Sequence, residues 1–377
     1  MQLIEVQSSS HIKAFHHLPF EIYADDPVWV PHLQQDVEKV FDPSKNKLFR
    51  TGMAKRWLAV HNGKVCGRIA AFVNEKYSKG MEQPTGGLGF FESINDKVVA
   101  FALLDEAIAW LKSNGMDAVD GPINFGEKNM FWGLQIENFV DPPSYGMNYN
   151  PEYYKGFFAE YGFEVYYNQF CYKRRLDIPV HEDFEEKSKR MMQDPKFAIR
   201  NIRGRSLERV AEDFLTVYNN AWGGHHGFKK MKLREAQKIM KALKPVIDRD
   251  IVIFAFYDEK PIAFYVNIPE LNEIFCYVNG NLNWLGKLKF LYHKWRRTPK
   301  TMVGIVFGID RAFHGRGVES TIVKYTEKNV VPMKRYTDTV MVWIGDFNPK
   351  MITIVEKLGP EKYRTLATFL YLFDRTK

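Results

Sequence analysis

The chain has 377 residues, enough for about two domains that each bury a core. Its apolar fraction of 45% and charged fraction of 26% are ordinary for a soluble globular protein, and no apolar run approaches the roughly 20 residues of a membrane helix. No signal-peptide pattern is visible either, so we expect a cytoplasmic protein without a transmembrane segment. The net charge of +8 suits an anionic partner, but it does not choose among a small ligand, RNA and a membrane surface.

Sulfur and imidazole groups are too scattered to predict a disulfide or a metal site. Cys66, Cys171 and Cys276 are odd in number and form no C-x-x-C pair, which favours reduced thiols. His225 and His226 are adjacent, but no nearby carboxylate or cysteine completes a ligand set. We therefore predict no metal.

The first half of the chain predicts helices followed by strands. Ser8–Ser10 offers helix caps, and Asn62-Gly63 is the strongest short hairpin signal in the sequence. Asn95-Asp96 precedes a long apolar helix that ends at Asn114-Gly115. The other expected elements are helices over 12–22 and 33–41, strands over 57–61, 65–73, 87–92 and 117–119, a helix within 148–163, and closing strands over 164–176.

The second half repeats this order. Gly162 and Gly359 end two helices and lie 197 residues apart, and the hairpin turns at Asn62 and Glu259 show the same offset. We therefore predict an internal duplication, with copies over 1–180 and 181–377 and a helical linker near 180–196. The elements expected in the second copy are helices over 207–222 and 233–243, strands over 251–257, 262–266, 302–309 and 339–344, and helices over 319–331 and 348–359. This order is typical of an α/β fold with a mixed sheet and helices on both faces.

A glycine-containing turn between the strand 302–309 and the helix 319–331 is the clearest functional signal. Glycines let a ligand approach the backbone, while the first helical amides lack partners and lie at the positive end of the helix dipole. Such a turn is suited to an anion such as a phosphate group. Downstream, the strand 339–344 is followed by Asn348-Pro349 at the head of another helix.

Together these segments resemble the GNAT acyl-CoA N-acyltransferases. The pyrophosphate loop of that family reads Q/R-x-x-G-x-G/A, and an Asn after the next strand opens a short helix. Here the loop begins at His314, the middle glycine is Gly317, and Glu319 takes the place of the last small residue. Asn348 matches the family Asn, whereas Val355 replaces a tyrosine that many members place near the thiolate leaving group. The resemblance implies two tandem GNAT-like domains, each a mixed, mostly antiparallel sheet flanked by helices.

The resemblance also implies acetyl-CoA or another acyl-CoA as the cofactor, bound in the second copy. In the first copy the corresponding strand is followed by Glu92–Lys97, which contains no glycine loop. Two of the implied residues have simpler interpretations, since Asn348 also suits a helix cap and Arg316 a solvated side chain. The residues implied to hold the cofactor are Ile309, Arg311, Gly315, Arg316, Gly317, Val318, Glu319 and Asn348.

An amine must lose a proton before it attacks a thioester, so the reaction needs a general base. The candidates are Asp310, His225 and His226, and amides near 309–311 would hold the thioester carbonyl. We expect the acceptor, a small-molecule or peptide amine, between the copies, beside the 222–228 loop and the long segment 121–149. The residues expected to bind it are Trp222, Phe228, Asn124, Asn129, Trp132 and Tyr145.

The segment 287–300 predicts an amphipathic helix with a basic face. It contains six Lys or Arg residues and no acid, with Trp284, Leu288, Leu291 and Trp295 within or beside it. A solvated face, an anionic lipid surface, RNA and the CoA 3′-phosphate all remain open as its partner.

Three functions remain open at this stage. The first is an acyl-CoA N-acyltransferase, and the second is a relative of the aminoacyl transferases that use tRNA. The third is a non-catalytic binding protein, favoured by Glu319, Val355 and the loopless first copy. Because one copy can complete the sheet of the other, we expect a monomer.

Overall fold

The structure is a computed structural model that describes residues 1–223 and 230–374. The first half opens with two helices and continues into strands that alternate with helices. Its elements are β1 (Gln2–Glu5), α1 (Ser9–Ile22), α2 (Gln34–Phe41), η1 (Lys47–Arg50), β2 (Gly52–His61), β3 (Lys64–Asn74), α3 (Glu75–Ser78), β4 (Thr85–Ser93), α4 (Lys97–Ser113), β5 (Ala118–Gly121), β6 (Leu134–Glu137), α5 (Tyr153–Tyr161) and β7 (Glu164–Arg175).

The second half repeats this order after a linker helix, and it carries two extra helices before its central strand. Its elements are α6 (Glu182–Met192), β8 (Phe197–Asn201), α7 (Leu207–Trp222), α8 (Leu233–Leu243), β9 (Val252–Tyr257), β10 (Lys260–Pro269), α9 (Asn272–Val278), α10 (Trp284–Trp295), β11 (Thr301–Ile309), η2 (Arg311–Phe313), α11 (Val318–Asn329), η3 (Val331–Met333), β12 (Asp338–Gly345), α12 (Pro349–Glu356) and β13 (Glu361–Leu372).

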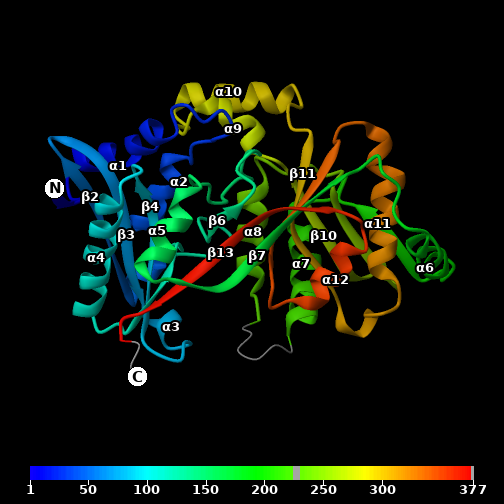
Figure 1. The fold of residues 1–377 in the computed structure, drawn as a ribbon. Coiled ribbons are helices and arrows are strands. Elements are labelled where there is room, and N and C mark those ends of the chain that lie inside the picture. Colours follow the sequence, from blue (N-terminus) through cyan, green and yellow to red (C-terminus); the bar gives the residue numbers. More distant parts are fainter. Residues whose placement is uncertain (224–229, 375–377) are drawn as a thin grey trace.

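One sheet of 13 strands runs through the whole molecule, with helices packed around each half (Figure 1). Its order is β1-β2-β3-β4-β5-β13-β7-β12-β11-β10-β9-β8, and β6 pairs with β13. Among the pairings of the described strands, only β4–β5 and β11–β12 are parallel. The predicted mixed, mostly antiparallel sheet with flanking helices is confirmed.

Local signals explain most of the elements. The Ser8 side chain accepts a hydrogen bond from the His11 amide at 3.1 Å and caps α1, and Asp96 caps α4 in the same way. Asn62 has a φ of 49° in the turn between β2 and β3, as Glu259 does with 58° between β9 and β10. Both turns therefore take the left-handed conformation that two-residue hairpins need. The helical linker is present as α6.

Asn150 precedes α5, and its side chain accepts a hydrogen bond from the Gln135 amide at 2.7 Å and donates to the Gln135 carbonyl at 3.1 Å. One prediction for the first copy was wrong. The segment 121–149, predicted without secondary structure, contains the strand β6, which pairs with β13. Sequence reasoning missed β6 because its partner lies more than 200 residues away, and local patterns carry no information on such a pairing.

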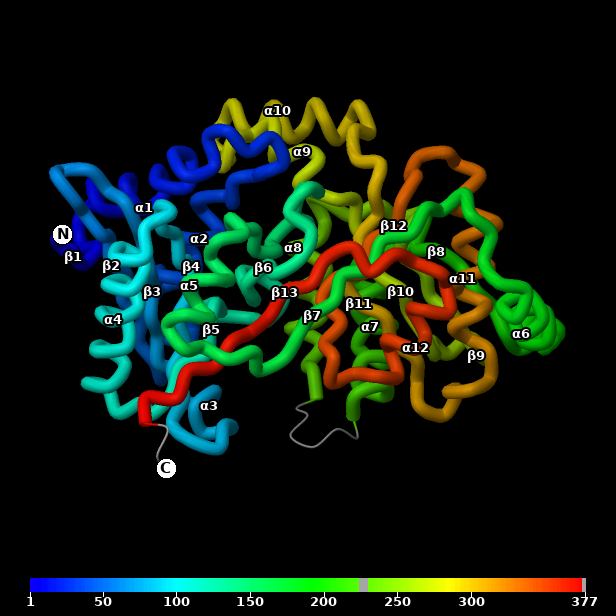
Figure 2. Tube along the Cα trace, in the orientation of Figure 1, coloured from blue at the N-terminus to red at the C-terminus, as the bar shows by residue number. Residues whose placement is uncertain are grey.

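The two copies exchange their last strands. β13, the end of the second copy, pairs with β5 of the first copy, and β7, the end of the first copy, pairs with β12 of the second. β7 and β13 pair with each other in the middle of the sheet, and Figure 2 shows the two strands crossing between the halves. Each half of the sheet thus includes a strand from the other side of residue 180.

Separate cores lie against the two halves of the sheet. In the first copy α4 and α5 cover it with side chains such as Leu103 and Phe158, both fully buried. The second copy is covered on both faces, by a cluster around Phe214 and Phe264 and by another around Ile253 and Ile322. Each such side chain contributes about 1.5–3 kcal/mol when it leaves water.

A half-buried carboxylate links α1, α2 and β2. Glu38 accepts hydrogen bonds from His16 at 2.8 Å and from Arg56 at 2.5 Å and 3.2 Å. Desolvation by burial raises the pKa of Glu38, but the bonds from His16 and Arg56 outweigh it and lower the pKa to about 2. Because the folded-state pKa lies below the ordinary 4.5, the stability from this contact is present above pH 4.5 and lost as the pH falls towards 2.

Glu38→Gln should therefore destabilise the protein at neutral pH, and the difference from wild type should shrink as the pH falls below 4.5. Urea unfolding midpoints measured from neutral to acid pH test this. The control is Glu160→Gln, which removes an exposed carboxylate paired with Lys97. A constant difference between Glu38→Gln and wild type across this range would contradict the assignment.

Within the ranges 1–223 and 230–374, the structure contains no helix that combines the length and apolar character of a membrane span.

Candidate functional site

The two central strands of the second copy diverge. β11 and β12 pair in parallel only from Thr301–Asp338 to Gly304–Met341, although β11 continues to Ile309 and β12 to Gly345. Beyond Gly304, alternate N–H groups of β11 therefore face the side that β12 has left.

A bulge on β11 marks the start of this divergence. The register between β10 and β11 skips Ile305, and the side chain of this residue is 40% exposed although β11 is an internal strand. Bulges redirect a strand and its side chains, and they occur often beside functional sites. β4 of the first copy has a comparable register shift, with Phe90 at a φ of 50°. In the second copy the divergence leaves a gap in the hydrogen-bonded ladder between β11 and β12 beyond Gly304 and Met341.

The glycine turn follows directly after β11. Gly315 and Gly317 have φ values of 74° and 89°, a left-handed conformation that glycine adopts without strain. The first intrahelical bond of α11 runs from Thr321 to the Gly317 carbonyl at 3.0 Å, so the amides of residues 318–320 precede the hydrogen-bonded ladder. The backbone therefore presents donors at the positive end of a helix.

The linker helix α6 packs against this turn. A Cβ atom added to Gly317 would lie 3.1 Å from the backbone oxygen of Lys187. Glu185 holds α6 to α11 through Lys324 at 2.7 Å, and the hydrogen bond from Lys324 lowers the pKa of Glu185. A cleft of about 280 Å³ lies between α6, α11 and α12. It is lined by His181, Asp183, Phe184, Lys187, Glu319, Ser320, Ile354 and Lys357.

Charges of both signs surround this cleft. Lys187 and Lys357 can attract a phosphate group, whereas Asp183 and Glu319 repel one. Arg316 is exposed, and its guanidinium lies 5.1 Å from the ring centroid of Phe313. The backbone donors and the two lysines fit an anion at the turn, and Asp183 and Glu319 are the residues that oppose it.

Asp310, the candidate base at the end of β11, is held in place by three hydrogen bonds. Its carboxylate accepts from the Asn220 amide nitrogen at 2.7 Å and from the Ala312 backbone at 3.0 Å. Its own N–H donates to the Ile262 carbonyl at 2.7 Å. The amides of residues 309–311 were expected to hold the thioester carbonyl. Of these, the Asp310 amide is already hydrogen-bonded within the protein.

The remaining predicted residues of the turn are spread along it. Ile309 is buried, and its carbonyl accepts a hydrogen bond from His314 Nε2 at 3.0 Å. Arg311 is exposed and donates to a backbone carbonyl of α7 at 3.3 Å. Val318 is fully buried under the start of α11. These contacts fix the turn between β11, α7 and α11.

Asn348 and Val355 occupy the helix that follows β12. Asn348 caps α12, accepting from the Met351 amide at 3.3 Å. Val355 is 1% exposed and packs against Tyr172 and Ile344. The position where many GNAT proteins have a tyrosine therefore offers no proton donor to the leaving thiolate.

No protein-family model matches the chain. A tandem GNAT protein from the clavulanic acid biosynthesis pathway superimposes over 100% of this chain and 99% of its own, with a TM-score of 0.57 and 10% sequence identity. A GCN5-related N-acetyltransferase from Sphaerobacter thermophilus matches 98% of this chain and 96% of its own, with a TM-score of 0.52 and 9% identity.

The fold is the tandem GNAT fold. A third structure is a GCN5-related glucosamine N-acetyltransferase region in a fungal multi-domain β-N-acetylglucosaminidase. It matches 98% of this chain with a TM-score of 0.56 and 14% identity, and this chain spans 38% of that protein.

Two proteins resemble the chain in sequence over nearly its whole length. Protein YghO of Escherichia coli K12 is 26% identical over 364 residues, which is 95% of this chain and 92% of that protein. The bacterial ceramide synthase of Caulobacter vibrioides is 25% identical over 378 residues, which is 98% of this chain and 97% of the synthase.

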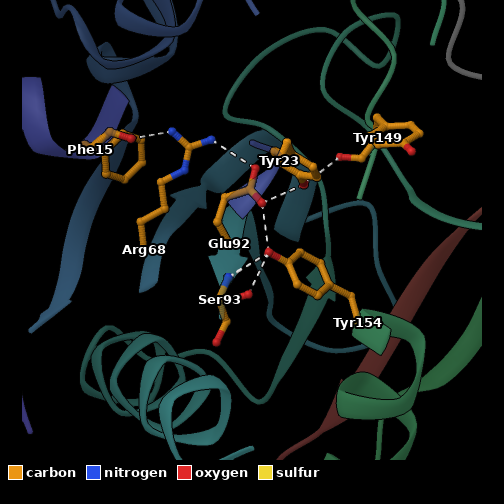
Figure 3. A network of polar contacts seen from close by, with 7 residues as sticks. All are labelled: Phe15, Tyr23, Arg68, Glu92, Ser93, Tyr149 and Tyr154. Atoms are coloured by element: carbon orange, nitrogen blue, oxygen red, sulfur yellow. Dashed lines mark hydrogen bonds and ion pairs between the residues drawn. The ribbon is translucent and has the colours of Figure 1, made fainter. Parts of the chain in front are cut away.

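The first GNAT copy differs where the second has its gap. Beyond β5 the chain folds back over β4, so that a Cβ on Gly89 would lie 1.8 Å from the Ile123 carbonyl oxygen. Glu92, at the end of β4, lies in a buried network (Figure 3). Its carboxylate accepts from Tyr23 and from Tyr154 at 2.8 Å each and pairs with Arg68 at 3.3 Å. A buried carboxylate at this end is unsuited to a pyrophosphate.

The residues expected to bind the acceptor are not gathered in one place. Asn124 is buried and donates to the carbonyls of Glu127, at 2.9 Å, and of Met130, which organises the loop itself. Trp132 is 3% exposed, and its Nε1 donates to the Tyr167 hydroxyl at 2.9 Å.

Tyr145 lies elsewhere and donates to Asp36 of α2 at 2.6 Å, while Asn129 is exposed. Trp222 ends α7 and stacks on Tyr218 with 4.8 Å between ring centroids. His225, His226 and Phe228 lie outside the described residues.

Two residues beside the gap were missed by sequence reasoning. Trp343 has a φ of 64° in a bulge of β12, a conformation that bulky side chains rarely adopt. It packs against the cluster containing Phe125 and Trp132, at the junction of the copies. The second residue is Tyr265, whose hydroxyl lies at the point where β11 and β12 part: a Cβ on Gly304 would lie 2.8 Å from it. Neither residue has a spacing or motif in the sequence that distinguishes it from core.

Proposed function

We propose that this protein is an acyltransferase that moves an acyl group from acyl-CoA to an amine. The observation that carries the proposal is the divergence of β11 and β12 directly beside the glycine turn. A gap in a sheet leaves backbone groups free to bind an extended, amide-containing part of acyl-CoA. The adjoining start of a helix suits the phosphate groups of the same cofactor. The tandem GNAT fold supports the same function.

The cofactor would lie with its pyrophosphate on the amides of residues 318–320. Lys187 and Lys357 would add positive charge, and the missing Cβ of Gly317 lets α6, which carries Lys187, pack close to the turn. Acyl-CoA supplies an activated acyl group as a thioester. The carbonyl of that thioester would accept a hydrogen bond from β11 on the side facing the gap, where developing negative charge is stabilised.

In this scheme the amine nitrogen attacks the thioester carbonyl, a C–N bond forms and the C–S bond breaks. The nitrogen gives up a proton, for which Asp310 at the end of β11 is the candidate base. The thiolate takes up a proton, and with Val355 in the usual tyrosine position we assign this role to Tyr265 at the point of divergence. Desolvation raises the pKa of Tyr265, so its hydroxyl is protonated and able to donate.

A long-chain amine is the acceptor class that the name of one relative favours. The Caulobacter vibrioides relative is named a ceramide synthase, and it aligns along both chains almost completely. A ceramide contains an amide bond, and this scheme forms a bond of the same kind. A small polar or peptide amine is the other acceptor class.

The test is release of free thiol from acyl-CoA of short and long acyl chains, with long-chain amines and small polar amines compared as acceptors. We expect thiol release that needs an amine, and Tyr265→Phe should lower kcat by about 100-fold without weakening acyl-CoA binding. The matched control is Tyr257→Phe, on the neighbouring strand β9, which should keep wild-type kcat. Stabilisation by acyl-CoA without turnover of any amine would instead indicate a non-catalytic binding protein. No effect of acyl-CoA on stability would remove the proposal and favour a tRNA-dependent reaction.

A further inference from the structure

The helix α10 carries its apolar side chains on the outside of the molecule. In Figure 1 it lies along the outer edge, beyond α9 and away from the sheet. Gly286 is its only buried residue. Six large apolar side chains of this 12-residue helix are 50–77% exposed, namely Trp284, Leu285, Leu288, Leu291, Tyr292 and Trp295.

These six side chains form one continuous stripe. With about 100° between successive residues, they fall within an arc of about 120°. Gly286 and the half-buried Phe290 lie on the opposite side of the helix, facing the protein. A helix of a soluble protein normally turns its apolar arc towards the core, and exposed patches of this kind mark interaction sites.

Cations flank the stripe on both edges. By the same angular spacing, Lys289 lies beside one edge and Lys287 and Lys294 beside the other. Arg296, Arg297 and Lys300 continue the positive charge beyond the helix, and residues 274–309 include no acid. Lysines that border an apolar arc can place their ammonium groups among phosphates while the arc enters an apolar layer.

We propose that α10 docks this protein on a membrane surface that contains anionic lipids. The apolar stripe would enter the acyl boundary and the flanking cations would contact the headgroups. RNA would explain the cations but would leave the aliphatic part of the stripe uncovered. A second copy of the chain would bring two sets of cations together, which is unfavourable.

Docking through α10 leaves the candidate site free. β11 starts at Thr301, shortly after α10, and runs nine residues, about 30 Å, to the glycine turn. The turn therefore lies at the far end of the strand from the docked helix, where a water-soluble cofactor can reach it. At 12 residues, α10 is shorter than the roughly 20 that a span requires, so it lies along the surface.

The experiment is flotation of the full chain with phosphatidylcholine vesicles, with and without about 30% phosphatidylglycerol, at low and high salt. We expect binding to the anionic vesicles. The triple variant Trp284→Ser/Leu288→Ser/Trp295→Ser should reduce it by at least about 10-fold, although its charge is unchanged. Lys287→Gln/Lys289→Gln/Arg296→Gln should remove the preference for phosphatidylglycerol and the salt dependence.

The matched control is Val98→Ser/Val140→Ser/Ile178→Ser, three apolar residues at least 52% exposed elsewhere, which should bind as wild type does. Unfolding midpoints check that all variants fold. Equal binding of the apolar triple variant and wild type would overturn the proposal in favour of a purely electrostatic polyanion site. A second result would also overturn the proposal: the wild-type protein binds no vesicles and is a dimer, and the apolar triple variant is a monomer. The stripe would then bind a second copy of this chain.

Discussion

Gly317→Val should abolish the stabilisation that acyl-CoA gives to the native protein. At a ligand concentration 100 times Kd, binding to the native state alone adds about 2.7 kcal/mol, which for a chain of this length raises the unfolding midpoint by about 3 °C. Valine is strained at the φ of 89° found here, and its Cβ would meet the Lys187 backbone oxygen at 3.1 Å. Both effects move the amides that we assign to the pyrophosphate.

The matched control is Gly204→Val. Gly204 also has a positive φ, 75°, but a Cβ there meets nothing within 4 Å. Without ligand, the free energy of unfolding of both variants should fall by about 1–2 kcal/mol because of backbone strain. Only Gly317→Val should lose the shift with acetyl-CoA. If both variants keep the full shift, the cofactor does not bind at this turn.

Arg68→Met should destabilise the protein by about 3–5 kcal/mol, because it leaves the buried carboxylate of Glu92 without its cation. Arg68 and Glu92 are 4% and 8% exposed, and Arg68 also donates to the Phe15 carbonyl at 2.5 Å. Burial lowers the pKa of Arg68 and raises that of Glu92. Desolvation thus outweighs attraction for both groups, which is why the loss of one partner is costly. Urea unfolding measures the loss.

The pH dependence of this loss distinguishes a stranded charge from lost packing. Removing Arg68 raises the folded-state pKa of Glu92 further above its ordinary 4.5, so protonation restores stability as the pH falls towards that value. The deficit of Arg68→Met should therefore shrink in acid. Lys97→Met is the control, because the exposed Lys97–Glu160 pair should contribute less than about 1 kcal/mol. A deficit that is independent of pH would indicate lost packing alone.

Periodicity and capping signals were enough to predict most elements of the fold. α7 and α8 have the predicted bounds of 207–222 and 233–243, and α11 begins one residue before its predicted start. These signals are local: side chains at helical spacing share one face, and a cap bonds amides two or three residues away. The glycine turn was visible for the same reason, since its conformation depends on residues that are adjacent in sequence.

The arrangement around the turn was decided by contacts between distant segments. The exchange of β7 and β13, the approach of α6 to Gly317 and the bulge at Trp343 all depend on residues far apart in the chain. Trp132 and Asn124 suited a binding loop by composition, but the fold buries both and engages their polar atoms. Composition shows which groups need partners, and only the packed structure decides whether the partner is the protein itself.

The same division applies to the helix α10. The sequence determined that lysines and large apolar side chains alternate there at helical spacing. Only the tertiary structure decided that the small face of Gly286 packs inward and the apolar stripe faces outward. An amphipathic pattern fixes the two faces of a helix, but the orientation of those faces depends on which of them the neighbouring elements leave room to bury.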